Sequence, residues 1–267
     1  GNGWSGSIIF IFDSLTFLIS SYILFFLKPD ERNAPKKTEL FSYGEFKKGL
    51  SYFISTPSIR NIAISISLSL FAAGALFILG YTFLTVNLGF TESSFGFMIS
   101  AFGLGILFSM ILLSYFLSSF KRVSILIGIG MLLTGAALLN GFRSDEFLYI
   151  LISIFVAGAG TGGVYLLTIS FLQATTQNEL RGRVFGNFYS ICRIALFISF
   201  LTTGLIANFL NNQFDGSGVE IVLQSSALLI FVSGIISLFS GYKKINSEIE
   251  IENSNFNNIK LDFGSTK

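Results

Sequence analysis

The stretch VFGNFYSICRIALFISFLTTGLIANFL, residues 184–210, sets a single arginine within a long apolar run. A helix needs about 20 mainly apolar residues to cross the hydrocarbon core of a bilayer, and this run is long enough. Arg193 lies well inside the run, although its guanidinium stays charged at any physiological pH. The stretch therefore predicts a transmembrane helix that carries a charge near mid-depth.

The composition of the whole chain shows which solvent surrounds that helix. Hydrophobic residues make up 52% of the 267 residues and charged residues only 12%, whereas about a quarter of the residues in a soluble domain are charged. The 32 phenylalanines and 27 glycines suit helices that face lipid and also pack closely on one another. The sequence predicts an integral membrane protein with the lipid bilayer as its partner.

The same composition excludes several classes of function. A net charge of +2 provides no basic surface for nucleic acid. With no histidine and a single cysteine, Cys192, the chain offers no disulfide, no zinc site and no histidine-activated nucleophile. It also lacks the motif that binds ATP phosphates. We therefore expect no enzyme, no metal and no cofactor.

Seven stretches are long and apolar enough to span a membrane as helices. They lack the two-residue alternation of barrel strands. The expected fold is all-α, with seven transmembrane helices, the last six of which form one bundle over residues 60–242. The predicted helices cover residues 6–27, 60–86, 93–117, 123–141, 147–172, 184–210 and 221–242.

The charges between the helices predict their orientation, because lysine and arginine gather in cytoplasmic loops. One side of the predicted membrane carries almost all of them, and the other carries only Arg143, beside two acidic residues. This pattern places the C-terminus in the cytoplasm and the N-terminus outside. The basic residues of the cytoplasmic side are Lys28, Arg32, Lys36, Lys37, Lys47, Lys48, Arg60, Lys121, Arg122, Arg181, Arg183, Lys243 and Lys244.

The segments outside the bundle also have distinct compositions. In the linker 28–59, Ser42 and Glu45 resemble a capping box ahead of an amphipathic helix; the alternative is a solvated connector. Residues 243–267 are rich in Asn and charge, which predicts a disordered cytoplasmic tail. Residues 1–27 begin outside the membrane without a signal peptide. We therefore expect further helices upstream of Gly1.

Four landmarks occur in order along the chain: FDSLTFLIS (12–20), GLSYFISTPSIRNI (49–62), LGFTESSFGFMISAFGLG (88–105) and QATTQNELRGRVFGNF (173–188). Together they resemble the second half of a major facilitator superfamily transporter. The branch is similar to the drug-efflux and siderophore-export group, which includes macrolide-efflux and enterobactin-exporter-like proteins. The resemblance covers roughly residues 4–242.

This resemblance implies that the first span is helix six of twelve and that residues 60–242 are the C-terminal six-helix bundle. The missing N-terminal half of the transporter would be the partner of that bundle. The chain departs from the family pattern at SSFKRV (118–123), which lacks the usual acidic residue. The expected activity is export of amphipathic small molecules, such as drugs, macrolides or siderophores, from a bacterial cell by alternating access, with protons as the coupling ion.

Arg193 is the first candidate for the substrate site. It lies ten residues beyond Arg183, so about 15 Å into the membrane. A charge at that depth normally faces a bundle interior or a wet cavity. Arg193 would there attract an anionic or carbonyl-bearing substrate, or a carboxylate whose protonation it controls. The alternative is a structural ion pair or a bond to helix carbonyls.

Asp13 is the only acidic residue well inside a predicted span. It would carry a coupling proton, or serve only as a hydrogen-bonded residue near its helix start. Four other polar residues are weaker candidates for the cavity wall: Tyr165, Thr168, Asn61 and Tyr81.

Glycines and the cytoplasmic loop motif complete the set of candidates. The glycines let helices approach closely, or let them bend during transport: Gly103, Gly105, Gly158, Gly160, Gly162 and Gly163. The loop residues latch one conformation onto the opposing half, or only determine topology: Gln173, Gln177, Arg181, Gly182 and Arg183. Three other identities remain open: a truncated or inactive transporter, a seven-span receptor or signalling protein, and a membrane enzyme.

Overall fold

The structure is a computed structural model that describes residues 4–26, 51, 54–116, 123–176, 180–214 and 216–239. It divides into two units, Gly1–Tyr43 and Gly44–Lys267. Most of the predicted amphipathic helix after Ser42, and the whole predicted tail 243–267, lie outside the described residues.

The described elements are all helical, which confirms the all-α prediction. Within the described residues, six helices of the second unit are long and apolar enough to span a membrane, and α1 is apolar over the shorter stretch Phe10–Phe26. The described part contains no strand. The elements are α1 (Trp4–Phe26), α3 (Pro57–Thr82), the π-helix η2 (Phe83–Asn87), α4 (Glu92–Phe116), α5 (Val123–Gly141), α6 (Phe147–Thr175), α7 (Arg181–Gln213) and a last helix, Gly218–Phe239.

Local chemistry marks where several of these helices begin and end. Thr56 is extended and Pro57 occupies the first turn of α3, where its missing N–H costs nothing. Glu92 lies in the first turn of α4, where its negative charge interacts favourably with the helix dipole. Gly89 and Gly216 adopt positive φ angles of 68° and 90° in the turns that precede α4 and the last helix. The chain therefore reverses within a few residues between helices.

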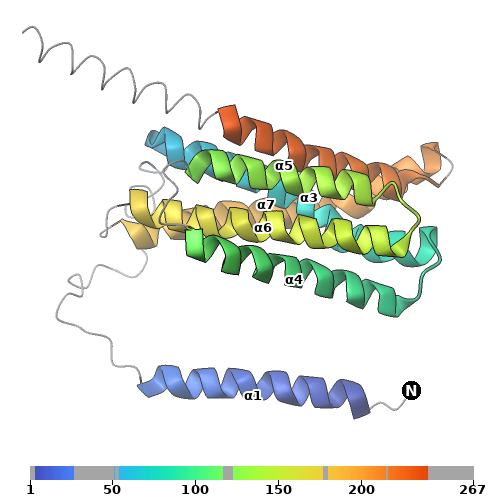
Figure 1. Ribbon diagram of the computed structural model, residues 1–267, viewed down its shortest axis with the longest axis horizontal. Coiled ribbons are helices and arrows are strands. Elements are labelled where there is room, and N and C mark those ends of the chain that lie inside the picture. Colours follow the sequence, from blue (N-terminus) through green and yellow to red (C-terminus); the bar gives the residue numbers. More distant parts are fainter. Residues whose placement is uncertain are drawn as a thin grey trace, which may run out of the picture. The chain divides into compact units, whose positions relative to one another are not determined.

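The helices of the second unit lie side by side with their long axes roughly parallel (Figure 1). Helix α6 packs against both α4 and α5, whereas α3 packs against α7. The last helix lies against α5, since a Cβ at Gly135 would meet the backbone of Phe231 at 2.6 Å. The six helices form one bundle in which α6 is flanked on two sides.

Glycines set how closely α6 approaches its two neighbours. A Cβ at Gly158 would collide with the backbone of Phe102 on α4, and one at Gly160 with the Thr134 side chain on α5. A Cβ at Gly105 on α4 would likewise collide with the backbone of Phe155 on α6. Backbones in direct contact leave no room for a side chain between them, so these contacts depend on glycine.

The other predicted packing glycines differ from one another. Gly162 faces the α4 backbone at Ile106, and a Cβ at Gly163 would lie 3.1 Å from the Leu113 side chain, closer than ordinary van der Waals contact. A Cβ at Gly103 would meet no atom within 4 Å. Gly103 therefore lies outside the close helix contacts of the described chain.

The buried apolar side chains form two clusters, one at each end of the bundle. The first gathers the end of α3 with the start of α6 and of the last helix, and includes Leu84, Ile150 and Leu223. The second gathers the starts of α3, α5 and α7 with the end of α6, and includes Ile59 and Leu172. The middle of the bundle lies between these two cores.

Replacing Gly158 with alanine is expected to destabilise the chain by about 1–3 kcal/mol, because the new methyl group overlaps the α4 backbone. The matched substitution Gly103→Ala should instead raise stability by about 0.5–1 kcal/mol, since it meets open space and favours the helix. Circular dichroism during SDS titration of the chain in mild detergent measures both. Equal effects of the two substitutions would contradict the packing role of Gly158.

Candidate functional site

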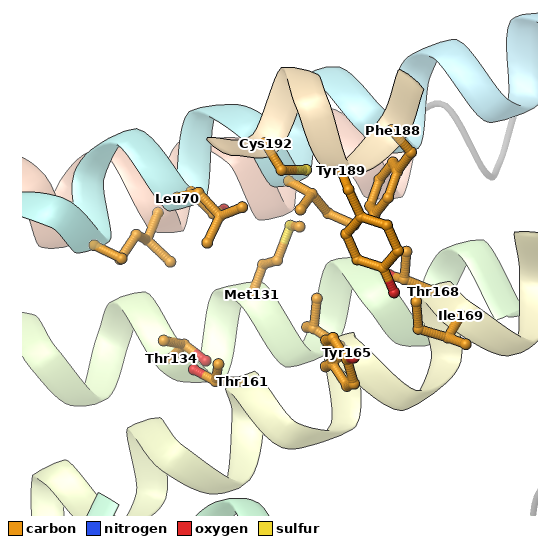
Figure 2. Close-up of a pocket in the computed structure, with 15 residues that line it drawn as sticks. Leu70, Met131, Thr134, Thr161, Tyr165, Thr168, Ile169, Phe188, Tyr189 and Cys192 are labelled. Atoms are coloured by element: carbon orange, nitrogen blue, oxygen red, sulfur yellow. The ribbon is translucent and has the colours of Figure 1, made fainter. Parts of the chain in front are cut away.

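A cavity of about 220 Å³ opens between α3, α6 and α7, with α5 and the last helix behind it. It lies between the two buried clusters, where Met131, Phe188 and Cys192 of one cluster meet Ile230 of the other. Figure 2 shows the side chains that line it. They are Ile66, Ser69, Leu70, Ala73, Met131, Thr134, Thr161, Val164, Tyr165, Thr168, Ile169, Phe188, Tyr189, Cys192 and Ile230.

Most hydroxyl groups in the cavity wall already have partners within the protein. Thr134 and Thr161 each donate to a carbonyl one turn earlier in their own helix, over 2.9 Å. The hydroxyls of Ser69 and Ser233 share a hydrogen bond of 2.6 Å between α3 and the last helix. Thr168, which is 2% exposed, has no partner for its hydroxyl among the described residues. The wall is thus apolar apart from this one unpaired group.

The mouth of the cavity is more polar than its wall. Tyr165 on α6 is 54% exposed, and Tyr189 reaches from α7 toward α6 (Figure 2). The Tyr189 phenol interacts with Tyr165 and lies in the electrostatic field of Arg193. Arg193 follows Tyr189 by four residues, so the two project from the same face of α7. Two phenols and one guanidinium therefore gather beside the opening.

Arg193 itself is exposed and does not line the cavity wall. It lies twelve residues beyond the start of α7, which is about 18 Å along the helix. The acidic residues of the described bundle all lie near the opposite end of the helices: Glu92, Asp145, Glu146 and Glu220. Glu220 lies two residues after Gly218, which packs against Asn211 near the end of α7. Asn211 is about 27 Å from Arg193 along α7, so Glu220 is far from the guanidinium. The described bundle thus places no carboxylate beside this cation.

The structure brings together only part of the predicted cavity set. Tyr165 and Thr168 line the cavity. Asn61 is half-buried near the start of α3, and Tyr81 packs its ring edge-on against Phe95 at 5.5 Å, near the end of α3. Neither lines the cavity. They therefore lie toward opposite ends of the bundle.

Asp13 belongs to the other unit, on α1. Its side chain is exposed, and its backbone carbonyl accepts a hydrogen bond of 2.7 Å from the Thr16 hydroxyl. The described part of α1 thus holds Asp13 in a regular helix.

The loop motif of residues 173–183 joins the end of α6 to the start of α7. The guanidinium of Arg181 donates a hydrogen bond of 2.9 Å to the backbone carbonyl of Gln173, in the last turn of α6. Carbonyls at a helix end lack partners within the helix and attract cations. Arg181 therefore closes this helix end. Gln177 lies outside the described residues, Gly182 has no close neighbour, and Arg183 is half-buried.

Sequence reasoning missed several residues of the site. Tyr189 had a usable signal, since its spacing of four from Arg193 places both on one helix face. Met131 and Cys192 had none, because an apolar residue in a span faces lipid or a cavity with equal ease. Their place follows only from the packing of α5 and α7 around the opening.

Replacing Thr168 with valine is expected to raise the stability of the chain by about 1 kcal/mol, because burying an unpaired hydroxyl costs about 1–3 kcal/mol. Thr134→Val is the matched control. It removes a hydroxyl that has a partner and should lower stability by about 0.5–1.5 kcal/mol. Unfolding in SDS measures both variants, and a loss of stability in Thr168→Val would show that its hydroxyl has a partner.

A sequence profile of the Major Facilitator Superfamily matches residues 2–198 and also residues 62–254. An uncharacterized MFS-type transporter of Methanocaldococcus jannaschii is 27% identical over 218 residues, which cover 80% of this chain and 51% of that protein. The chain thus spans about half the length of this relative.

Among solved structures, the fold is similar to that of the POT family transporter PepTSo, in its in meso crystal structure. The TM-score is 0.53 at 17% identity, over 68% of this chain and 37% of that one. At this level of identity, the likeness concerns the fold and not the substrate.

Proposed function

Because the chain belongs to the Major Facilitator Superfamily, we propose that the full-length protein is a secondary transporter for amphipathic small molecules. The observation that carries this proposal is the cavity, whose wall is apolar and whose mouth holds Tyr165, Tyr189 and Arg193. Ligand sites of this kind combine apolar walls with a few placed polar groups. An amphipathic molecule matches both parts.

We propose that the chain contributes the C-terminal bundle of that transporter. The order of the four sequence landmarks supports this assignment. The match to about half of the M. jannaschii relative fits a chain that supplies one half of a transporter. In superfamily transporters, two halves rock about a site near the membrane midplane. The exposed side of α7 that carries Arg193 would then face the other half.

The direction and energy of transport are further parts of the proposal. The resemblance to drug-efflux and siderophore-export proteins favours export, powered by the proton gradient, across a bacterial plasma membrane. The basic residues of the loops support a cytoplasmic C-terminus. Asp13 is the proposed proton carrier within this chain, since it is the acidic residue well inside a span.

The loop between α6 and α7 is the proposed latch. Arg181 binds the Gln173 carbonyl at the end of α6, and a guanidinium can exchange such a partner for a carboxylate of the opposing half. Gly182 keeps the loop open on one side, since it has no close neighbour. Exchange of this bond between two states would couple the loop to rocking of the halves.

Transport is tested with the full-length protein in liposomes, with an imposed proton gradient and a fluorescent amphipathic dye. Saturable dye movement that stops when a protonophore collapses the gradient is the expected result. Thr161→Phe, which fills the cavity, should lower the rate by about tenfold, the effect of losing about 1.4 kcal/mol of binding.

Leu148→Phe is the control for added bulk, because Leu148 is 67% exposed and lies outside the cavity. This variant should transport as the unchanged protein does. Dye movement that neither saturates nor responds to the gradient would contradict the transporter proposal.

A further inference from the structure

We infer that the site binds an anionic amphiphile in two parts, with the apolar group in the cavity between α3, α6 and α7 and the anionic head on Arg193 at its mouth. This inference rests on the proposed transport function and names the substrate class for the same site. Its three supports are the size of the cavity, the chemistry of its wall and the position of Arg193 beside its mouth.

The size of the cavity shows that it holds only part of a substrate. Its volume is about 220 Å³, whereas pockets that enclose drug-sized ligands measure about 300–1,000 Å³. A dry cavity of about 150 Å³ can bind benzene. This cavity therefore fits one ring or a short alkyl group, and the rest of a larger molecule must lie outside the mouth.

The wall of the cavity excludes a charged group. The hydroxyls of Thr134, Thr161 and Ser69 are already bound to other protein groups. An ion moved into such an apolar space would lose its hydration and find no partner, which is strongly unfavourable. Among the described residues of the wall, the Thr168 hydroxyl has no partner, but it is fully buried and offers no accessible group to a ligand. The part of the substrate that enters must be uncharged.

The mouth supplies the opposite chemistry. Arg193 is exposed beside Tyr189, which lines the cavity, and follows Cys192, which lines it as well. No acidic residue of the described bundle lies at this level to neutralise it. A guanidinium binds a carboxylate through two parallel hydrogen bonds, and this pairing is stronger than neutral ones. The head group that fits is therefore a carboxylate or a similar anion.

The Arg193 guanidinium disfavours head groups that are not anionic. A cationic amphiphile would meet repulsion at the mouth, and a neutral one would gain no ion pair there. The geometry thus predicts a ranking of binding affinity among amphiphiles that have the same tail and differ in the charge of the head group. Anionic molecules should bind most tightly, neutral ones less so, and cationic ones most weakly.

Three probes with the same butylphenyl tail test this order: 4-butylbenzoate, 4-butylbenzamide and 4-butylbenzylammonium. Binding to the full-length protein in detergent is measured by isothermal titration calorimetry, and flux is measured in liposomes. The benzoate should bind about tenfold more tightly than the amide, the usual effect of one hydrogen-bonded charge. Arg193→Gln should remove this preference, whereas Arg193→Lys should keep part of it.

Arg143→Gln is the matched control, since it removes an exposed arginine from the α5–α6 loop. It should leave the preference for benzoate unchanged. Equal binding of the three probes, no binding of any of them, or a benzoate preference that survives Arg193→Gln would overturn the inference. If Arg193→Gln fails to fold, a cationic probe that binds the unchanged protein as well as benzoate overturns it equally.

The two measurements separate this inference from the transport proposal. Benzoate binding that depends on Arg193, without any flux, supports the anion site and contradicts transport. Gradient-driven flux that shows no preference for benzoate, in the unchanged protein as in Arg193→Gln, supports transport and overturns the anion site.

Discussion

Direct backbone contact between α6 and its two neighbours is the constraint on which the bundle depends. At Gly158 and Gly160, α6 meets the backbone of α4 and a side chain of α5 with no space for a Cβ. In lipid, helices gain little from burying apolar side chains, because the acyl chains are equally apolar. Close van der Waals contact must therefore supply much of the association. The glycines of α6 determine which faces of α4 and α5 turn inward.

The cavity is a consequence of this arrangement. Tight contacts join α6 to α4 and α5 on one side, and α3 packs against α7 on the other. Large apolar side chains fill both ends of the bundle, and the space between the two clusters stays open. Tyr165 of α6 and Tyr189 of α7 meet at its mouth. A site built on packed helices is held more firmly than one built on loops.

The two arginines of α7 show how the same residue type serves different purposes along one helix. Arg181, at the start of the helix, satisfies a backbone carbonyl at the end of α6. Arg193 lies three turns further on and meets no described carboxylate. A charge kept within an apolar span is expensive, and it is retained where a pathway or ligand uses it. The difference between the two lies in what surrounds them and not in the side chain.

The sequence by itself determined the medium, the helical class and the extent of the bundle helices, because apolar length and the need to satisfy backbone groups in lipid are local properties. The span predicted at 184–210 differs from α7 by three residues at each end. Only the tertiary structure decided which residues share the site. Arg193 stands at the mouth and not in the wall, and Gly103 lies outside the close contacts, because both outcomes depend on which helix faces meet. These helix–helix contacts join residues that are far apart in the sequence, and no local sequence pattern encodes them.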